Sequence, residues 1–332
     1  MPTIAVGDVT NPNGLAAGLN LAHRKYAQGM LGEIFAEMKA ERFMASRAMV
    51  LDKDTVTETT IGDLIQRWAC SFDPKGDMAF QPRDLEVCRL KIDREVGCLE
   101  ALHKSYLSEM FTSADDFTDN IRTYSEWYQT RMYNKIGEEM EIAALRGWKD
   151  DSVPQASSNY LNSVDGIGTI AERLVNNGTV ISIPTGPLTP GSTLDKVEDF
   201  FASIPNKVRR GASRGILWMS EANYRQYWQD RRAAEYNQNC CDNKDAAMRV
   251  EYFNVDIEWF EGLDGSDLLF YTPANNVVKL FNITEDPRTM RFNAQPFNRT
   301  VKYMADFKRG YNFLDIRYVY VNDQPLHGSL NV

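Results

Sequence analysis

Two stretches of the chain place apolar residues at the three- and four-residue spacing of an amphipathic helix. In residues 28–49 these positions are Leu31, Ile34, Phe35, Met38, Ala45 and Met49. In residues 117–147 they are Ile121, Tyr124, Tyr128, Met132, Ile136, Met140 and Ala143. Because each set forms one apolar stripe, both stretches are predicted to be helices, the second a rod about 45 Å long. Residues 1–26 have few large apolar side chains and are predicted to be an extended arm.

Between residues 50 and 95 the period changes to the alternation of a β-strand. Residues 50–60 are β-branched and polar, residues 72–80 contain a Pro-to-Gly turn, and residues 85–93 alternate with one slip in register near Cys88. This pattern indicates one long hairpin with a bulge. Two arms of about twenty residues would reach roughly 60 Å. A two-stranded ribbon of that length is marginal in water, so another surface is expected to hold it.

Residues 165–300 alternate short helix and strand patterns between Pro- and Gly-rich loops. Helices are predicted over residues 167–177, 194–204 and 221–236, and strands over residues 180–183, 215–219 and 253–259. The second helix is expected to begin at Ser192 or Thr193, and the third at Ser220. Residues 268–273 and 277–281 are expected to continue the same sheet.

The last part of the chain has the clearest strand alternation. Its apolar residues at every second position are Val301, Tyr303, Ala305, Phe307, Tyr311 and Phe313. Residues 308–310 (KRG) are predicted to form a turn, so a terminal hairpin is expected.

The composition is that of a chain with a sizeable core. Of its 332 residues, 43% are hydrophobic and 25% are charged, and more than one packed region is expected. No apolar run approaches the length of a membrane helix and no signal segment is evident, so the protein is expected to be soluble and made in the cytoplasm. The five cysteines lack a C-x-x-C pair and are predicted to be reduced thiols, with Cys240 and Cys241 in a surface loop.

Few groups suited to catalysis or metal binding come together in the sequence. His23, His103 and His327 lack metal-ligand spacing, and neither a phosphate-binding loop nor a nucleophile elbow is found. Residues 262–267 (GLDGSD) resemble a cation loop but lack its full set of ligands, so a turn between strands is preferred. We therefore predict no catalytic residue, no cofactor site and no metal site, and we do not expect an enzyme.

Positive charge is concentrated in residues 204–232 of a chain whose net charge is −9. Seven Lys and Arg stand there against two acids, interleaved with aromatic residues. Either a nucleic-acid face or a packed strand and helix would fit, and the second is preferred because periodicity accounts for the aromatic residues. Trp218 would then lie in a buried strand, and Tyr224 and Trp228 would form the buried face of a helix. The net negative charge argues against a protein that coats nucleic acid.

Three stretches, residues 79–96, 194–232 and 301–323, resemble parts of the major capsid proteins of tailed bacteriophages, whose fold is named after phage Hong Kong 97. The resemblance implies an α+β capsid fold with an N-terminal arm, an extended β-hairpin loop, a peripheral domain with a long spine helix, and an axial domain. The implied domains are residues 1–48 (arm and helix), 49–95 (extended loop), 96–164 with 300–332 (peripheral) and 165–299 (axial).

The same resemblance implies a protein that self-assembles through pentamers and hexamers into the icosahedral head around a double-stranded DNA genome. The chain would lie in the virion after synthesis and assembly in the host cytoplasm. Portal, scaffold and cement or head-completion proteins are the implied partners, the packaged DNA is a non-specific neighbour, and no membrane is involved. Because no long N-terminal scaffolding segment is visible, assembly is expected to use a separate scaffold protein or none.

Two alternatives stay open from the sequence. One is an encapsulin-like compartment of the same fold, and the other is an unrelated α/β nucleic-acid-binding protein or enzyme. If the capsid reading holds, charged residues of the axial domain and of the extended loop are the expected contacts between subunits. These candidates are Lys207, Arg209, Arg210, Arg214, Arg231, Arg232, Asp73, Lys75, Asp77 and Arg83.

Overall fold

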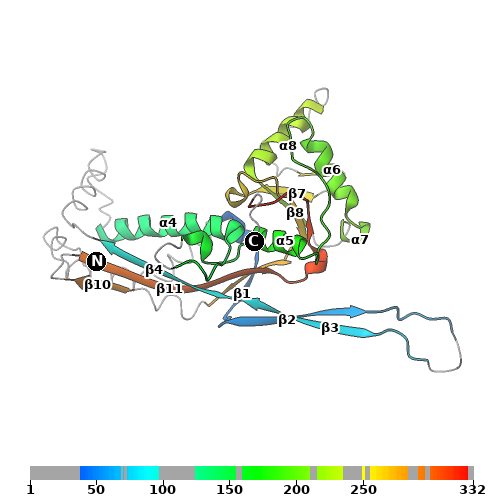
Figure 1. The fold of residues 1–332 in the computed structure, drawn as a ribbon, viewed down its shortest axis with the longest axis horizontal. Helices are drawn as coiled ribbons and strands as arrows, with labels where there is room; N and C mark the ends of the chain where they lie inside the picture. The colour runs from blue at the N-terminus through cyan, green and yellow to red at the C-terminus, as the bar shows by residue number, and fades with distance from the viewer. Residues whose placement is uncertain are drawn as a thin grey trace, which may run out of the picture.

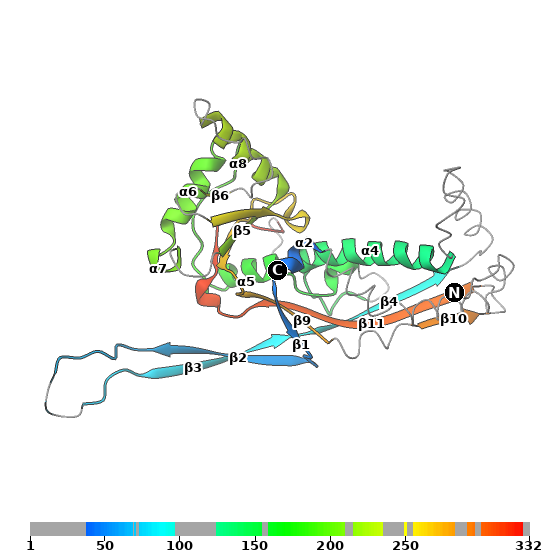
Figure 2. The ribbon, with the colours of Figure 1, turned by 180° about the vertical axis from the view of Figure 1, so that it is seen from behind.

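The computed structural model describes residues 38–68, 70, 73–96, 124–154, 159–209, 215–234, 249–250, 255–282, 291–295 and 300–327. They form a long sheet with a helix along it, a compact sheet covered by helices, and a hairpin that projects from the body (Figure 1; Figure 2 shows the opposite side). No helix among these residues is long and apolar enough to cross a membrane. The mixture of sheets and helices is the predicted α+β class.

The long sheet is built around its longest strand, β11, which has neighbours on both edges. Its strands are β1 (Ala45–Ala48), β4 (Cys88–Val96), β9 (Val277–Phe281), β10 (Arg291–Gln295) and β11 (Thr300–Phe313). β4 is antiparallel to β11 along one edge, β10 and β9 follow one another along the other, and β1 is parallel to β9. The rod helix predicted over residues 117–147 is confirmed from residue 124 on as α4 (Tyr124–Arg146), which runs along this sheet with Met140 and Ala143 buried (Figure 1). Residues 117–123 lie outside the described residues.

The compact sheet lies at the other side of α4 and has helices over it (Figure 1). In spatial order its strands are β12 (Tyr320–Val321), β8 (Phe270–Pro273), β5 (Gly215–Met219), β7 (Val255–Trp259) and β6 (Arg249–Val250). The helices are α6 (Thr193–Ser203), the short α7 (Asn206–Arg209) and α8 (Glu221–Ala234). Phe200 and Phe201 of α6 pack with Leu217 and Tyr271 of the sheet and close this core.

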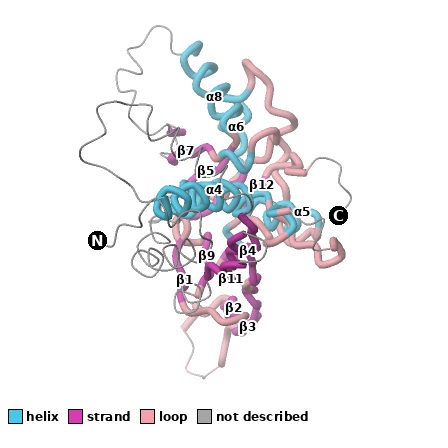
Figure 3. The backbone as a smooth tube through the Cα atoms, turned by 90° about the vertical axis from the view of Figure 1, so that its left-hand side faces the viewer, coloured by secondary structure: helices cyan, strands magenta, loops and turns pink. Residues whose placement is uncertain are grey.

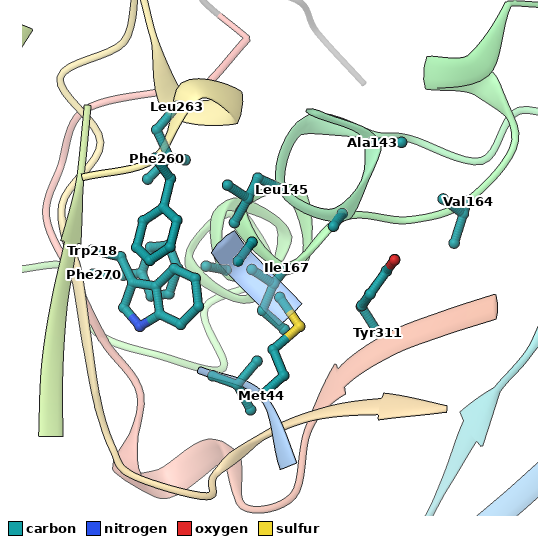
Figure 4. Packing of buried hydrophobic residues seen from close by; sticks show 14 of the residues in the cluster. Met44, Ala143, Leu145, Val164, Ile167, Trp218, Phe260, Leu263, Phe270 and Tyr311 are labelled. Atoms are coloured by element: carbon teal, nitrogen blue, oxygen red, sulfur yellow. The ribbon is translucent and has the colours of Figure 1, made fainter. Parts of the chain in front are cut away.

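A second hydrophobic core joins the two sheets (Figure 4). The Trp218 ring stacks on Phe260 and Phe270, with centroid distances of 4.2 and 5.2 Å. Leu145 of α4 and Tyr311 of β11 belong to the same cluster, so all three layers are packed together. The helices α5 (Ile167–Asn176), η3 (Tyr160–Asn162), η4 (Glu261–Leu263) and η6 (Ile316–Tyr318) lie around it.

The helix predicted over residues 28–49 is wrong at its C-terminal end, and residues 28–37 lie outside the described part of the chain. Within residues 38–49, only α2 (Lys39–Arg42) is helical, and β1 begins three residues later. Phe43 leaves the helix to pack edge-on against the Trp218 ring, at 6.3 Å between centroids. Pairing of β1 with β9 then completes the sheet, so tertiary contacts outweigh the local helix pattern.

A buried and a partly buried carboxylate hold α2 in the body. Glu41 is 1% exposed, pairs with Lys279 Nζ at 3.1 Å and accepts a hydrogen bond from the Tyr311 hydroxyl at 2.9 Å. Glu141 of α4 accepts from the Ala40 N–H at 2.9 Å. Burial raises the pKa of Glu141, although this hydrogen bond opposes the change. The contacts tie α2 to the long sheet and to α4.

The hairpin consists of β2 (Lys53–Ile61) and β3 (Met78–Glu86), with nine residue pairs and a loop over residues 62–77 (Figures 1 and 3). Its paired part is shorter than predicted because β4 pairs with β11 instead. The register slip near Cys88 therefore marks a change of partner. Val87 interrupts the strand there, and its N–H donates to the Asp52 carbonyl at 3.0 Å.

The turn predicted at residues 308–310 is wrong, because β11 continues through them as one strand. From Val301 to Phe313 every odd-numbered residue is buried, with no change of face. Gly310 allows the backbones of β11 and β3 to approach closely and does not form a turn, since a Cβ atom there would lie 2.4 Å from the Glu86 carbonyl oxygen. The terminal hairpin is thus replaced by a strand that passes beside the root of β2 and β3.

Two further strand predictions are corrected. Of residues 180–183, only Ile183 makes a β-bridge, to Asn322. Residues 277–281 form β9 in the long sheet and do not continue the compact one. The pairings therefore cross the predicted domain limits, because β9 and β10 join β11 whereas β12 joins β8. The division into peripheral and axial domains stays a prediction.

The three helices predicted between residues 165 and 240 are confirmed as α5, α6 and α8. Ser220 Oγ accepts from the Asn223 N–H at 3.4 Å and caps α8, as predicted. α6 is capped from outside, since the Asp230 carboxylate accepts from the Thr193 N–H at 2.8 Å. The predicted buried face of α8 is wrong at Trp228, which is 36% exposed, whereas Tyr227 is 1% exposed. Packing on the sheet selects the neighbouring stripe of this helix.

Candidate assembly surface

The projecting hairpin has two chemically different faces. Directly paired residues of an antiparallel ribbon point to the same face, and successive pairs alternate between the two. One face carries Asp54–Leu85, Val56–Arg83, Glu58–Gln81 and Thr60–Ala79. The other carries Lys53–Glu86, Thr55–Asp84, Thr57–Pro82, Thr59–Phe80 and Ile61–Met78. We name the first the body face, because Leu85 is fully buried on it, and the second the outer face.

The outer face changes from charged to apolar along the ribbon. Near the body, Lys53 Nζ lies 2.8 Å from Glu86 Oε1. The hydrogen bond and the charges of this pair raise the pKa of Lys53 and lower that of Glu86. Farther out, Phe80 and Met78 are both exposed. A ribbon that is charged at its root and apolar at its end presents its apolar surface away from its own body.

Large apolar side chains gather at the end of the hairpin, and we name this group the tip cluster. Its members, with their exposed fractions, are Ile61 (52%), Leu64 (60%), Ile65 (92%), Trp68 (83%), Met78 (58%) and Phe80 (62%). Single apolar side chains on a surface are ordinary, but a group of this size marks a surface that another molecule covers. Full burial of one such side chain contributes about 1.5–3 kcal/mol.

The root of the hairpin is fixed to the long sheet. Leu85 is packed with Val50, Val278 and Leu280 in a small separate core. Arg83, one pair farther out on the body face, donates from Nη1 to Asn312 Oδ1 at 2.9 Å. Arg83 was predicted to contact other subunits, and the structure places its guanidinium in contacts within its own chain.

The other loop candidates lie beside the tip cluster. Asp73, Lys75 and Asp77 are all exposed in the loop that closes the hairpin. Lys75 Nζ donates to the Ile65 carbonyl at 3.3 Å, so the basic side chain folds over the backbone of the cluster. Their contact with a neighbouring subunit stays a prediction.

The basic candidates of the compact part lie on two helices. Lys207 and Arg209 are in α7, and Arg231 and Arg232 are near the end of α8 (Figure 1). The Arg232 guanidinium lies 5.5 Å from the exposed Trp228 ring. Arg231 Nη1 donates to the Arg249 carbonyl at 3.3 Å, and Arg209 is bonded to Asn206. Arg210 and Arg214 lie outside the described residues.

Residues 262–267 form the predicted turn, with Gly265 at a φ of 78°. Their carboxylates bind backbone groups: Asp264 accepts from the Glu221 N–H at 3.0 Å and Asp267 from the Leu188 N–H at 3.1 Å. Within the described ranges, no group of three or more His, Cys, Asp or Glu is suited to hold a metal ion. Cys240 and Cys241 fall outside those ranges.

Sequence reasoning missed the tip cluster. It treated the loop as a connection and selected its charged residues, although Trp68 and Ile65 stand there without any strand or helix period. Large apolar residues in a segment that predicts no packing were the available signal. Phe80 and Met78 alternate with small or polar residues on the adjoining strand, which is a second signal for one apolar face.

No protein-family model matches the sequence, and no curated protein does. Several solved structures match most of the chain. A chain of the native GTA particle capsid has a TM-score of 0.55 and 10% identity, covering 86% of this chain and 89% of that one. The capsid of Myoviridae phage XM1 matches with a TM-score of 0.51 and 10% identity, covering 87% of this chain and 91% of that one. The satellite phage P4 procapsid with its size determination protein matches with a TM-score of 0.50 and 12% identity, covering 89% of this chain and 90% of that one. The chain therefore has the Hong Kong 97-type capsid fold that the sequence resemblance implies.

Proposed function

We propose that this chain is the major capsid protein of a tailed bacteriophage and assembles into the icosahedral shell around its double-stranded DNA genome. The tip cluster is the observation that carries the proposal, because it offers apolar side chains on a projecting ribbon. A second copy of the chain is the partner that the capsid fold supports.

Contact through the hairpin is expected to be head-to-tail. The tip cluster of one copy would meet a different surface of the next, and contacts of this kind repeat around a ring until it closes. About 1 kcal/mol from each tip side chain would give roughly 6 kcal/mol per contact, before the entropy cost of association. A single contact is then weak, and a closed pentamer or hexamer gains stability from repeating it.

The charge of the chain fits a shell that encloses DNA without coating it. At a net charge of −9 the protein lacks the excess of cations that drives phosphate binding, so packaged DNA is a non-specific neighbour. The proposal includes a place in the virion, assembly in the host cytoplasm, and portal, scaffold and cement or head-completion proteins as partners. It assigns the exposed charges Asp73, Lys75 and Asp77 to the contact around the tip cluster.

Electron microscopy of the purified chain tests the proposal. Closed shells of uniform size are expected, and small discrete species at both low and high salt would count against it. The matched variant replaces residues 62–77 by Asn-Gly, which closes the strands directly after the Ile61–Met78 pair with a two-residue turn. This variant is expected to fold and to form no shells.

Particles from the native host distinguish the genome container from the compartment alternative. Nuclease-resistant double-stranded DNA inside the particles is the expected content. Particles that hold an enzyme and no DNA would instead show an encapsulin-like compartment.

A further inference from the structure

The hairpin touches its own body at a second place, beyond the small core at its root. Arg83 donates from Nη1 to Asn312 Oδ1 at 2.9 Å and from Nη2 to the Leu314 carbonyl at 3.1 Å. Nη2 also donates to the Phe313 carbonyl. One guanidinium on β3 is thus bonded to the end of β11 and the residue after it.

Acidic and basic partners extend this contact on the neighbouring strand. Glu58 of β2 lies 3.5 Å from Arg83 Nε and accepts from the Ile316 N–H at 3.5 Å. Arg317 Nη1 donates to the Thr59 carbonyl at 3.2 Å. Both strands of the ribbon are therefore bonded to the segment of residues 312–317.

The side chain of Arg317 is itself oriented by the body. Its Nε donates to Asp315 Oδ1 at 2.9 Å, and the Asp315 N–H donates to Asn276 Oδ1 at 2.8 Å. Although burial raises the pKa of Asp315, the hydrogen bonds and charge of Arg317 lower it overall. The ion pair is consequently formed in the single chain before any partner binds.

Burial separates the contact of Arg83 with Glu58 from ordinary surface ion pairs, whereas the Arg317 side chain is 41% exposed. The side chains of Arg83 and Glu58 are 25% and 10% exposed. The planar guanidinium fork serves several acceptors in fixed directions, which an ammonium group does not. The contacts therefore restrain orientation as well as distance.

The position of these contacts along the ribbon lets them control where its far end lies. The Arg83 and Glu58 side chains lie on the body face, beyond the Leu85 core, at the pairs Val56–Arg83 and Glu58–Gln81, and Arg317 binds the backbone carbonyl of Thr59 at the next pair. From the Asp54–Leu85 pair to the Ile61–Met78 pair the ribbon is roughly 23 Å long at 3.3 Å per residue. A swing of about 20° at the root would move its end by roughly 8 Å, more than one strand spacing.

We propose that Arg83, Glu58 and Arg317 are positioning residues that fix the angle at which the hairpin leaves the body. The tip cluster then reaches a neighbouring subunit in one orientation. The role in assembly rests on the proposed function, whereas the fixed angle is a property of the single chain.

Pulsed electron spin resonance measures this angle without assembly. Spin labels are attached at Ala79→Cys on β3 and Lys135→Cys on α4, both exposed, with the five native cysteines replaced by Ser. Labelled protein is diluted into unlabelled protein so that only distances within one chain are recorded. The tested variants are Arg83→Ala, Arg83→Lys and Glu58→Gln. Lys53→Ala is the matched control, because it removes a cation from the outer face that pairs within the hairpin.

The unmodified background and Lys53→Ala are expected to give one narrow distance distribution. Arg83→Ala and Glu58→Gln are expected to increase the width of this distance distribution at least twofold. Arg83→Lys is expected to give a width between theirs and that of the labelled protein without these substitutions. A distribution for folded Arg83→Ala as narrow as the background would overturn the proposal. If Arg83→Ala does not fold by circular dichroism, narrow distributions for both Arg83→Lys and Glu58→Gln would overturn it.

Shell size provides the second readout. Shells of Arg83→Ala or Glu58→Gln are expected to vary in diameter, whereas those of Lys53→Ala match the unmodified protein. Absence of shells from the unmodified protein, together with the expected distance changes, would refute the capsid function and leave the positioning role standing. Uniform shells from variants with widened distances would refute the link between hairpin angle and assembly.

Discussion

Replacement of Phe80 by Ser tests the tip cluster at one side chain. Phe80 is 62% exposed on the outer face of β3, and an aromatic side chain presents roughly 200 Å². About 120 Å² is therefore open to a partner, which at 25 cal/mol/Å² corresponds to at most about 3 kcal/mol per subunit contact. Since 1.4 kcal/mol is a factor of ten, Phe80→Ser is expected to raise the protein concentration needed for assembly by about 5-fold for a contribution of about 1 kcal/mol, and by up to about 100-fold at this maximum.

Light scattering and sedimentation over a range of protein concentrations give this threshold. Gln81→Ser is the control, because Gln81 is the next residue of the same strand and is also exposed, but points to the body face. Its threshold is expected to stay within a factor of about three, because exposed surface changes alter free energies by only about 0.5 kcal/mol. An unchanged threshold for Phe80→Ser, with the fold intact, would refute the role of the outer face.

Three further predictions concern the body. Glu41→Ala removes the carboxylate that lies 3.7 Å from Nε of the buried Arg309 and 3.1 Å from Lys279 Nζ, and urea unfolding of unassembled protein is expected to show a loss of about 3–5 kcal/mol in the free energy of unfolding; a loss below about 1 kcal/mol would contradict the buried pairing. Gly310→Ala places a Cβ atom 2.4 Å from the Glu86 carbonyl oxygen, and a loss of about 1–3 kcal/mol is expected by the same method. Burial raises the pKa of Glu141 in the folded chain, so the folded chain binds this proton more tightly than the unfolded chain does. The protonated side chain therefore stabilises the fold at low pH, and this contribution is lost as the pH rises from about 4.5 through the pKa of the folded state. The change in the free energy of unfolding caused by Glu141→Gln is therefore expected to be more favourable at pH 7 than at pH 4.5. An equal change at both pH values would exclude a raised pKa of Glu141.

The sequence shows the fold class and most helices because local signals agree with the packing there. Residues 193–203 and 221–234 are helical where the apolar period and the Ser220 cap predict it. The strand of Trp218 is also where the apolar run predicts it. Each of these segments contains the signal for its own helix or strand, although the face of residues 221–234 that is buried differs from the predicted one at Trp228.

Failures occur where a distant partner decides the conformation. Residues 45–48 have a helix pattern but form β1, because β9 offers an edge some 230 positions away in the chain. The composition of residues 308–310 wrongly indicated a turn. The core-facing residues stay at odd-numbered positions before and after Arg309, and this unbroken alternation indicates one strand. Reading the period before the turn residues would have predicted β11 correctly.

The candidate site was found only in outline. The marginal ribbon was recognised from its length, but Arg83 was selected for its charge, which says nothing about whether its partners lie in the same chain. Besides the Asn312 side chain, its acceptors are the backbone carbonyls of residues 313 and 314, and such groups leave no trace in a side-chain pattern. Conversely, the exposure of Trp68 depends on how far the loop projects, which only the assembled fold determines.

The passage of β3 into β4 across the single residue Val87 determines how the hairpin bears mechanical load (Figure 1). β4 is bonded to β11 through nine consecutive residue pairs, and their hydrogen bonds run perpendicular to the strands. A neighbour that pulls along the hairpin therefore applies shear to this ladder, and all of its bonds share the tension. A pull across the strands would break them one after another. The attachment of the hairpin is thus strongest against a pull along its own length.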